Sequence, residues 1–283
     1  METNEAQVKG LFLLVDRKSD EGLSRWTTEL EKRQMPALIV ADGHTINNNP
    51  ELIKRVAGGG FDMGCVYNEG PLWTDTHDDM VTWMPPWIQI ETPHLKTPYE
   101  VQLEIMTQID EKLTPLIGGT MRAFAGKYFS YNQDTQKIAD QLKIPYILAR
   151  GTAGARAVFY QPKEYAATII SVSNVPSKQL GTGSLCDESL KSRTETPADF
   201  RELLFGLDVD RVVLVAQSHI SGLMSDWWDV YMDYFDRANV QWLDLDNFVT
   251  VPPAIPNAEI PKNYRVDYMR LNLEKASEAG EMV

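Results

Sequence analysis

Short apolar runs that end in polar residues recur along this chain, and amphipathic segments of helical periodicity separate them. The clearest runs are residues 10–16 (GLFLLVD), 36–41 (PALIVA) and 211–217 (RVVLVAQ). Such runs are typical of parallel strands that helices cover on both faces. About seven or eight of them alternate with helices up to residue 250. This alternation predicts an α/β fold, a closed or nearly closed (β/α)7–8 barrel, with an open doubly wound sheet as the alternative.

Local signals mark where several of the helices begin and end. Residues 49–52 (NPEL) combine an Asn N-cap with Pro at the first helical position, and residues 58–60 (GGG) end that helix. Residues 97–100 (TPYE) predict a capping box at the start of a helix that runs to about Leu113. Residues 173–196 are rich in Ser, Thr, Gly and Lys and predict an exposed loop.

Composition excludes several classes of function. The 283 residues carry a formal charge of −13, which argues against nucleic acid as a partner because no basic surface would attract it. No apolar run approaches the ~20 residues of a membrane span. The first ten residues, METNEAQVKG, show no signal peptide, and the compartment stays open. We expect a tail over 1–9, a barrel domain over 10–250 and a C-terminal extension over 251–283.

Polar residues follow the predicted strands. Asp16, Asp42, His44, Arg122 and His219 are all expected at the carboxyl ends of strands, where barrels and open parallel sheets place their sites. The two cysteines, which stand far apart in the sequence, show no CxxC or zinc-finger spacing, and a disulfide between them is neither predicted nor excluded.

A stretch of about 30 residues after the third strand is rich in Trp and Pro. It holds too many large apolar side chains for a disordered segment, and we expect it to cover a cleft. Trp73, Trp83 and Trp87, together with Tyr128, are candidates to stack on sugar rings. Packing within the loop is the alternative for the three tryptophans.

The order of these signals resembles the polysaccharide deacetylase (NodB-homology) family over roughly residues 10–250. The signals that carry the resemblance are, in chain order, a strand ending in Asp, the NPEL helix, a Met-Gly strand, the RAFAG segment and a late strand ending in His. The resemblance implies a distorted (β/α)7 barrel and metal-assisted hydrolysis of an N- or O-acyl group on a sugar. In that family an Asp of the first strand and two histidines after the third strand hold the metal.

Several positions match the family pattern and imply roles. The first-strand Asp is the base, the late His is the general acid, and an Arg and a Gly belong to its Arg-Pro-Pro-Tyr-Gly motif. The matching residues are Asp16, Gly64, Pro71, Arg122, Gly126 and His219.

The metal ligands do not match. Arg17 stands where the family has its metal-binding aspartate, and Val66 and Gly70 occupy the two histidine positions. A divalent metal such as zinc could use other residues, and the candidates are Asp42 and His44 with His77 or Asp75. Their spacing fits no standard pattern, and the alternative is that they are surface polar residues.

Two functions follow. The first is a deacetylase-like hydrolase of an acyl amide or ester of a carbohydrate or related small molecule, with Asp16 as base, His219 as acid and Arg122 as orienting residue. The second is a catalytically inactive barrel that binds a glycan or another partner. Structural alternatives stay open: Asp16 as a helix cap or ion-pair partner, His219 bonded to local backbone, and Arg122 in a structural ion pair.

Overall fold

The computed structural model describes residues 7–69, 97–150, 155–176 and 182–250. Nine strands of this part form one sheet with the order β10-β1-β2-β3-β4-β5-β7-β6, and β11 also pairs with β1. Strands β8 and β9 form a separate hairpin. Every pair in the large sheet is parallel except β6 with β7. The strands are β1 (Val8–Val15), β2 (Leu38–Asp42), β3 (Asp62–Val66), β4 (Ala123–Ala125), β5 (Tyr146–Ala149), β6 (Val158–Tyr160), β7 (Thr168–Ser171), β8 (Asn174–Pro176), β9 (Thr182–Ser184), β10 (Arg211–Gln217) and β11 (Val240–Trp242).

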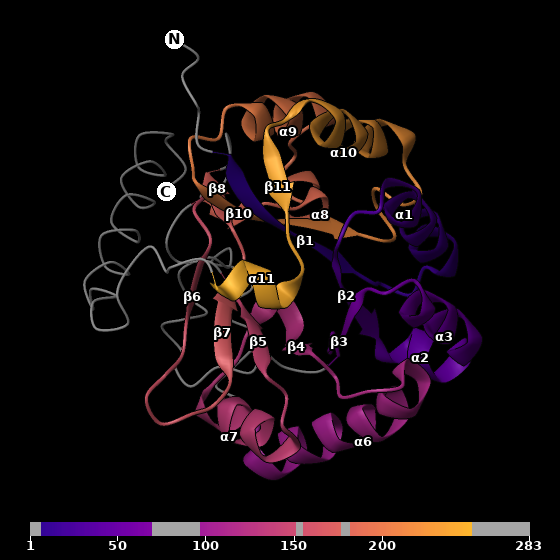
Figure 1. Cartoon of the computed structure of the whole chain (residues 1–283), viewed down its shortest axis with the longest axis vertical. Helices are drawn as coiled ribbons and strands as arrows, with labels where there is room; N and C mark the ends of the chain where they lie inside the picture. Colours follow the sequence, from indigo (N-terminus) through magenta and orange to yellow (C-terminus); the bar gives the residue numbers. More distant parts are fainter. Residues whose placement is uncertain (1–6, 70–96, 151–154, 177–181, 251–283) are drawn as a thin grey trace, which may run out of the picture.

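Helices lie along the top, right and lower sides of the ring of strands in the view of Figure 1, and α11 lies across its middle. None of the helices in the described ranges has the length and hydrophobicity of a membrane span. The predicted extension over 251–283 lies outside these ranges. The helices are α1 (Asp20–Arg33), α2 (Gly43–Asn48), α3 (Pro50–Gly58), α6 (Tyr99–Ile117), α7 (Gln133–Leu142), α8 (Asp187–Lys191), α9 (Pro197–Phe205), α10 (Ser225–Arg237) and α11 (Leu245–Thr250).

The sheet closes between β7 and β10 through a short segment after β9. The Leu185 N–H donates to the Ser173 carbonyl at 2.8 Å, and the Val215 N–H donates to the Leu185 carbonyl at 3.0 Å. Cys186 forms a parallel bridge with Val215. We call Ser173, Leu185, Cys186 and Val215 the seam. The seam completes the ring, so the nearly closed barrel predicted from the strand-helix alternation is confirmed.

Alternate residues of each strand face two separate cores. Leu11, Leu13 and Val15 of β1 belong to the cluster inside the barrel, whereas Phe12 and Leu14 pack against the helices. All five are fully or almost fully buried. Because both faces of β1 are covered, its sequence is a continuous apolar run rather than an alternating one.

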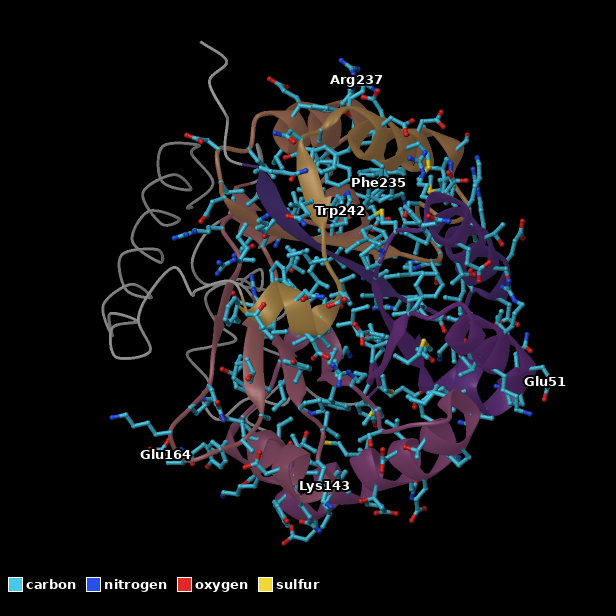
Figure 2. All side chains as sticks on the ribbon, viewed as in Figure 1. Glu51, Lys143, Glu164, Phe235, Arg237 and Trp242 are labelled. Atoms are coloured by element: carbon cyan, nitrogen blue, oxygen red, sulfur yellow. The ribbon has the colours of Figure 1, made fainter. Side chains whose placement is uncertain are left out.

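Aromatic side chains dominate the outer core between β1, α1 and α10. The Phe12 ring centroid lies 5.1 Å from that of Trp26 and 5.2 Å from that of Phe235. Phe235 and Trp242, which Figure 2 labels near the middle of this layer, have ring centroids 5.4 Å apart. Tyr231 packs edge-on against Trp26 at 5.2 Å. The aromatic residues of α10 therefore serve packing.

Helix α11 closes the end of the barrel where the strands begin. Leu245 and Phe248 are fully buried within the inner core. The Leu245 N–H donates to the Asp62 carboxylate at 2.9 Å, which ties the helix to the first residue of β3. Among the described residues, α11 therefore covers this end of the barrel, and the opposite end is the one that can hold a site.

Arg122 belongs to this closed end. It precedes β4 instead of following it, and its Nε lies 3.3 Å from the Asp62 Oδ1. Its Nη2 pairs with Asp246, which also accepts from the Tyr146 hydroxyl at 2.9 Å. The predicted position of Arg122 at the carboxyl end of a strand is wrong, because the strand begins after this residue.

The capping signals had mixed outcomes. The Asn49 side chain accepts the Leu52 N–H as predicted. The capping box predicted for 97–100 is wrong, since Pro98 is the N-cap and no side chain bonds to the helix end. Thr97 is buried, and its carbonyl accepts from the Gln102 side chain at 2.9 Å. The Thr97 side chain therefore faces the core rather than the helix terminus.

The exposed loop predicted for 173–196 is also wrong. The segment contains β8, β9 and α8, and Leu185, Cys186 and Asp187 are buried. Some of its described polar side chains satisfy buried backbone groups or line a cavity, whereas Lys191 and Thr194 are exposed.

Candidate functional site

A cavity of about 180 Å³ opens at the carboxyl ends of the strands. The last interior-facing residues of three strands line it, namely Val15 of β1, Val66 of β3 and Gln217 of β10. Phe129, from the turn after β4, adds a further apolar surface. Functional sites of (β/α) barrels lie at this end, so this cavity is the candidate site.

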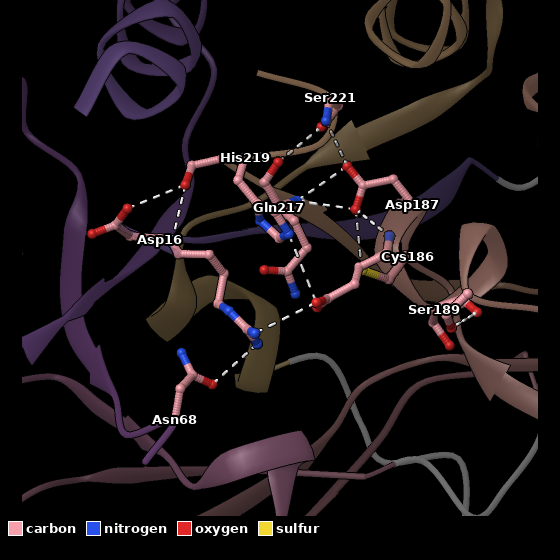
Figure 3. A network of polar contacts seen from close by, with 12 residues as sticks. Asp16, Asn68, Cys186, Asp187, Ser189, Gln217, His219 and Ser221 are labelled. Atoms are coloured by element: carbon pink, nitrogen blue, oxygen red, sulfur yellow. Dashed lines mark hydrogen bonds and ion pairs between the residues drawn. The ribbon is translucent and has the colours of Figure 1, made fainter. Parts of the chain in front are cut away.

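Arg17 extends over the cavity from the end of β1. Its backbone N–H donates to the Ser218 hydroxyl at 3.0 Å, which fixes the start of the side chain. Its guanidinium lies 3.5 Å from the Glu188 carboxylate and donates to the Asn68 amide oxygen at 3.4 Å (Figure 3). Glu188 and Asn68 both line the cavity.

Two more arginines line the cavity from other elements. Arg150 follows β5, and its backbone N–H donates to the Phe129 carbonyl at 3.0 Å. Arg193 follows α8, and its Nη1 donates to the Ser189 hydroxyl at 2.7 Å. A Cβ at Gly183 would lie 1.6 Å from that Nη1, so only glycine leaves room for this guanidinium.

Asp16 has a different position from the one expected of a base. Its carboxylate is fully buried and is not among the described residues that line the cavity. One oxygen accepts the Asp42 N–H at 3.2 Å, and the other accepts the Ser218 hydroxyl at 3.1 Å. Burial raises the pKa of Asp16, and the backbone N–H groups of Asp42 and Ser19 oppose that shift. Asp16 thus ties together the ends of β1, β2 and β10.

His219 lies in the turn after β10. Its Nε2 is 3.8 Å from a Glu188 oxygen, and its Nδ1 is buried with no hydrogen-bond partner in the part of the chain that the structure describes. Burial lowers the pKa of His219, and the Glu188 charge opposes that shift. A neutral imidazole therefore sits beside a carboxylate that lines the cavity.

Sequence inspection missed Asp187, the fully buried first residue of α8. Its Oδ1 accepts the Glu188 N–H at 2.7 Å and the Gln217 N–H at 3.1 Å, and its Oδ2 accepts the Ser221 N–H at 3.1 Å (Figure 3). Burial raises the pKa of Asp187 to about 6, although these donors lower it. The available signal is an acidic residue at a helix start, within a stretch whose polar composition predicts a loop.

The aromatic candidates are only partly placed. Tyr128 lines the cavity and is 48% exposed. Its φ of 54° is unusual for a side chain of this size, and it turns the backbone sharply after β4. Trp73, Trp83 and Trp87 lie outside the described residues, so their predicted contacts with a ligand stay predictions.

The non-standard metal candidates have other contacts. Asp42 caps α2 by accepting the His44 N–H at 2.7 Å, and it also accepts from the Asn68 amide at 3.2 Å. The His44 ring is exposed and lies 3.1 Å from the Asn48 amide. His77 and Asp75 lie outside the described ranges. No group of three or more His, Cys, Asp or Glu side chains suited to a metal occurs within those ranges.

The residues at the family's metal positions do not fit a metal either. Arg17 and Val66, which occupy two of these positions, line the cavity. A guanidinium carries no lone pair for a metal and repels a cation, and a valine offers no donor atom. Gly70, the third position, lies outside the described residues and has no side-chain donor in any conformation.

Known structures share this fold over most of the chain. The first is a protein from Mycobacterium smegmatis assigned as a polysaccharide deacetylase (13% identity, 92% of this chain, 98% of that chain, TM-score 0.58). The chain has the polysaccharide deacetylase fold. The same deacetylase fold is shared with PuuE allantoinase (10% identity, 87% and 91%, TM-score 0.55). It is also shared with a CE4 family pseudoenzyme from Bacillus anthracis (11% identity, 87% and 66%, TM-score 0.50).

A mutant of that pseudoenzyme with restored enzymatic activity matches at 9% identity, over 86% of this chain and 68% of that chain, with a TM-score of 0.51. No protein-family model matches the sequence, and comparison with curated protein sequences found no significant match. The deacetylase fold predicted from the resemblance is confirmed. Because proteins described as enzymes and as pseudoenzymes share it, the deacetylase fold alone does not decide the activity.

Proposed function

We propose that this protein uses the deacetylase fold to bind a small molecule, such as a sugar derivative, without metal-assisted hydrolysis. The observation that carries the proposal is Arg17, which points over the cavity at the position where the resemblance implies a metal-binding aspartate. This replacement reverses the charge at the heart of the implied metal site. Val66 removes a second ligand from the same wall.

The cavity itself supports binding. It combines an apolar floor with hydrogen-bonding groups from several elements, including Asn68, Ser184 and Gln217. Concave sites of this mixed character are typical of small-molecule binding. The likeness to a CE4 family pseudoenzyme shows that proteins so described occur with this fold.

The test compares the wild-type protein with a variant in which the implied ligands are put back, Arg17→Asp with Val66→His and Gly70→His. We expect the purified wild type to hold no stoichiometric zinc and to release no acetate from acetylated sugars with zinc added. The triple variant should bind zinc, since it restores three donors of ordinary type. Zinc-dependent acetate release by the wild type would overturn the proposal.

A second candidate is a metal-free acyl hydrolase, and the contact between His219 and Glu188 favours it. Glu188 would accept a proton from water as the water oxygen bonds to the acyl carbon. That proton would move from Glu188 to the adjacent Nε2 of His219, and from there to the departing amine or alkoxide as its bond to the acyl carbon breaks. Asp16 and Arg122 do not enter this scheme, because one is enclosed by backbone donors and the other lies at the closed end.

The second candidate is tested on acetylated sugars and amides without metal. It requires turnover by the wild type that disappears in both Glu188→Gln and His219→Ala but persists in Arg122→Gln. Absence of turnover across the acyl substrates leaves binding as the function of the cavity.

A further inference from the structure

We infer that the cavity binds its ligand through an anionic group, a carboxylate or a phosphate. The inference rests on the proposed binding function and specifies the class of ligand. Among the described residues that line the cavity, Arg17, Arg150 and Arg193 are cationic and Glu188 is the acidic one. Arg17 pairs with Glu188, so these three positive charges and one negative charge give the described lining a net charge of +2 around a space of about 180 Å³.

The positive charge of the cavity lining is opposite in sign to the net charge of the whole chain. The protein has 27 basic and 40 acidic residues, so a cavity lined at random would be negative on average. A cleft with walls of one charge concentrates ions of the opposite charge. The acidic remainder would repel anions elsewhere, which directs them to this cavity.

The three arginines come from separate parts of the barrel. Arg17 comes from the end of β1, Arg150 from the end of β5 and Arg193 from the end of α8. Arg193 is fixed by the Ser189 hydroxyl at 2.7 Å and by the lack of a side chain at Gly183. Arginine forks placed in advance lose little side-chain entropy on binding, and their geometry matches carboxylates and phosphates.

The size of the cavity limits the body of the ligand. About 180 Å³ lies below the ~300–1,000 Å³ typical of sites for drug-sized molecules. Val15, Val66 and Phe129 give one side of it an apolar surface. The best fit is a single compact unit that carries one anionic group, of the size of a monosaccharide acid or a monosaccharide phosphate.

The experiment is isothermal titration calorimetry on the full chain with four probes of similar size. Glucuronate carries a carboxylate, glucose 6-phosphate a phosphate, glucose no charge and glucosamine a positive charge. We expect one or both anions to bind, with an affinity that falls as salt is raised, and glucose and glucosamine to bind far more weakly. The stronger of the two anions identifies the group.

Arg17→Gln and Arg193→Gln should each weaken binding of that anion roughly 10- to 100-fold, because each removes a charged hydrogen-bond donor. Gly183→Ala should also weaken it without changing any charge, since the new Cβ displaces the Arg193 guanidinium. Arg237→Gln is the matched control, because Arg237 lies on the outside of α10 and pairs with Asp233. Circular dichroism of each variant verifies its fold.

The outcomes separate the two proposals. Binding of glucose as tight as that of the anions, or unchanged anion affinity in all three cavity variants, overturns the anionic class while leaving a binding function. Absence of binding by both anions also overturns it. Zinc-dependent acetate release by the wild type overturns the binding function itself, whatever the calorimetry shows.

Discussion

Replacing Asp187 by Asn tests how a buried carboxylate holds the cavity wall together. The two oxygens of Asp187 accept backbone N–H groups of Glu188, Gln217 and Ser221 from both sides. Asparagine keeps the shape but offers only one oxygen, so its NH₂ group must face a backbone donor. A buried donor left without an acceptor costs about 1–3 kcal/mol. We expect Asp187→Asn to lose this much free energy of unfolding at pH 5, where the wild-type carboxyl is largely protonated and still offers two oxygens.

The difference between the two proteins should depend on pH. Burial raises the pKa of Asp187 from 3.8 to about 6, so the folded state takes up a proton that the unfolded state releases. A raised pKa stabilises the fold at low pH, and that contribution is lost as the pH rises through about 6. As the pH falls from 8 to 5, the free energy of unfolding of the wild type should rise by about 1.4 kcal/mol relative to that of Asp187→Asn.

The measurement is urea unfolding of both proteins at several pH values from 5 to 8. Asp229→Asn, on the exposed side of α10, removes the same formal charge and reports the general effect of net charge. A stability difference that does not change with pH, or that grows as pH rises, refutes the reasoning. It would mean that the backbone donors outweigh burial and keep the carboxylate ionised.

Three further results are expected. Gly22→Ala should destabilise the protein by about 1–3 kcal/mol in thermal unfolding, because its Cβ would lie 1.9 Å from the Ser218 carbonyl, whereas Gly43→Ala, with nothing within 4 Å, should not. Arg122→Met should cost about 1 kcal/mol in urea unfolding by breaking the pairs with Asp62 and Asp246, and a change in ligand affinity would contradict its placement. In NMR titrations His219 should titrate below 6.5, and Glu188→Gln should lower that pKa further, since Glu188 opposes the effect of burial.

The fold was predictable because its signals are local and repeated. The run from Gly10 to Val15 is typical of a strand covered on both faces, and the cap at Asn49 set a helix start. Arg122 shows the limit of such reading. A strand boundary shifted by a few residues moves a side chain from one end of a barrel to the other, and sequence patterns do not fix boundaries that closely.

The site residues at the ends of strands were predictable from the sequence, whereas those in and after the short helix α8 were not. Arg17 and Val66 were identified because a family pattern gave their positions meaning. The contribution of Glu188, Ser189 and Arg193 was missed, because a short helix within a polar stretch has no periodicity to reveal it. Its position depends on the buried Asp187, whose partners lie about thirty residues further along the chain.

Ligand binding in the cavity is coupled to the stability of the seam. Leu185 and Cys186 close the ring by backbone bonds to Ser173 and Val215, and the chain passes directly from them into α8. A ligand that needs Arg193, which follows α8, in place binds only the closed ring. At 100 times its dissociation constant it adds about 2.7 kcal/mol to the free energy of opening that ring. Amide hydrogen exchange at Leu185 and Val215 should therefore slow when a ligand occupies the cavity.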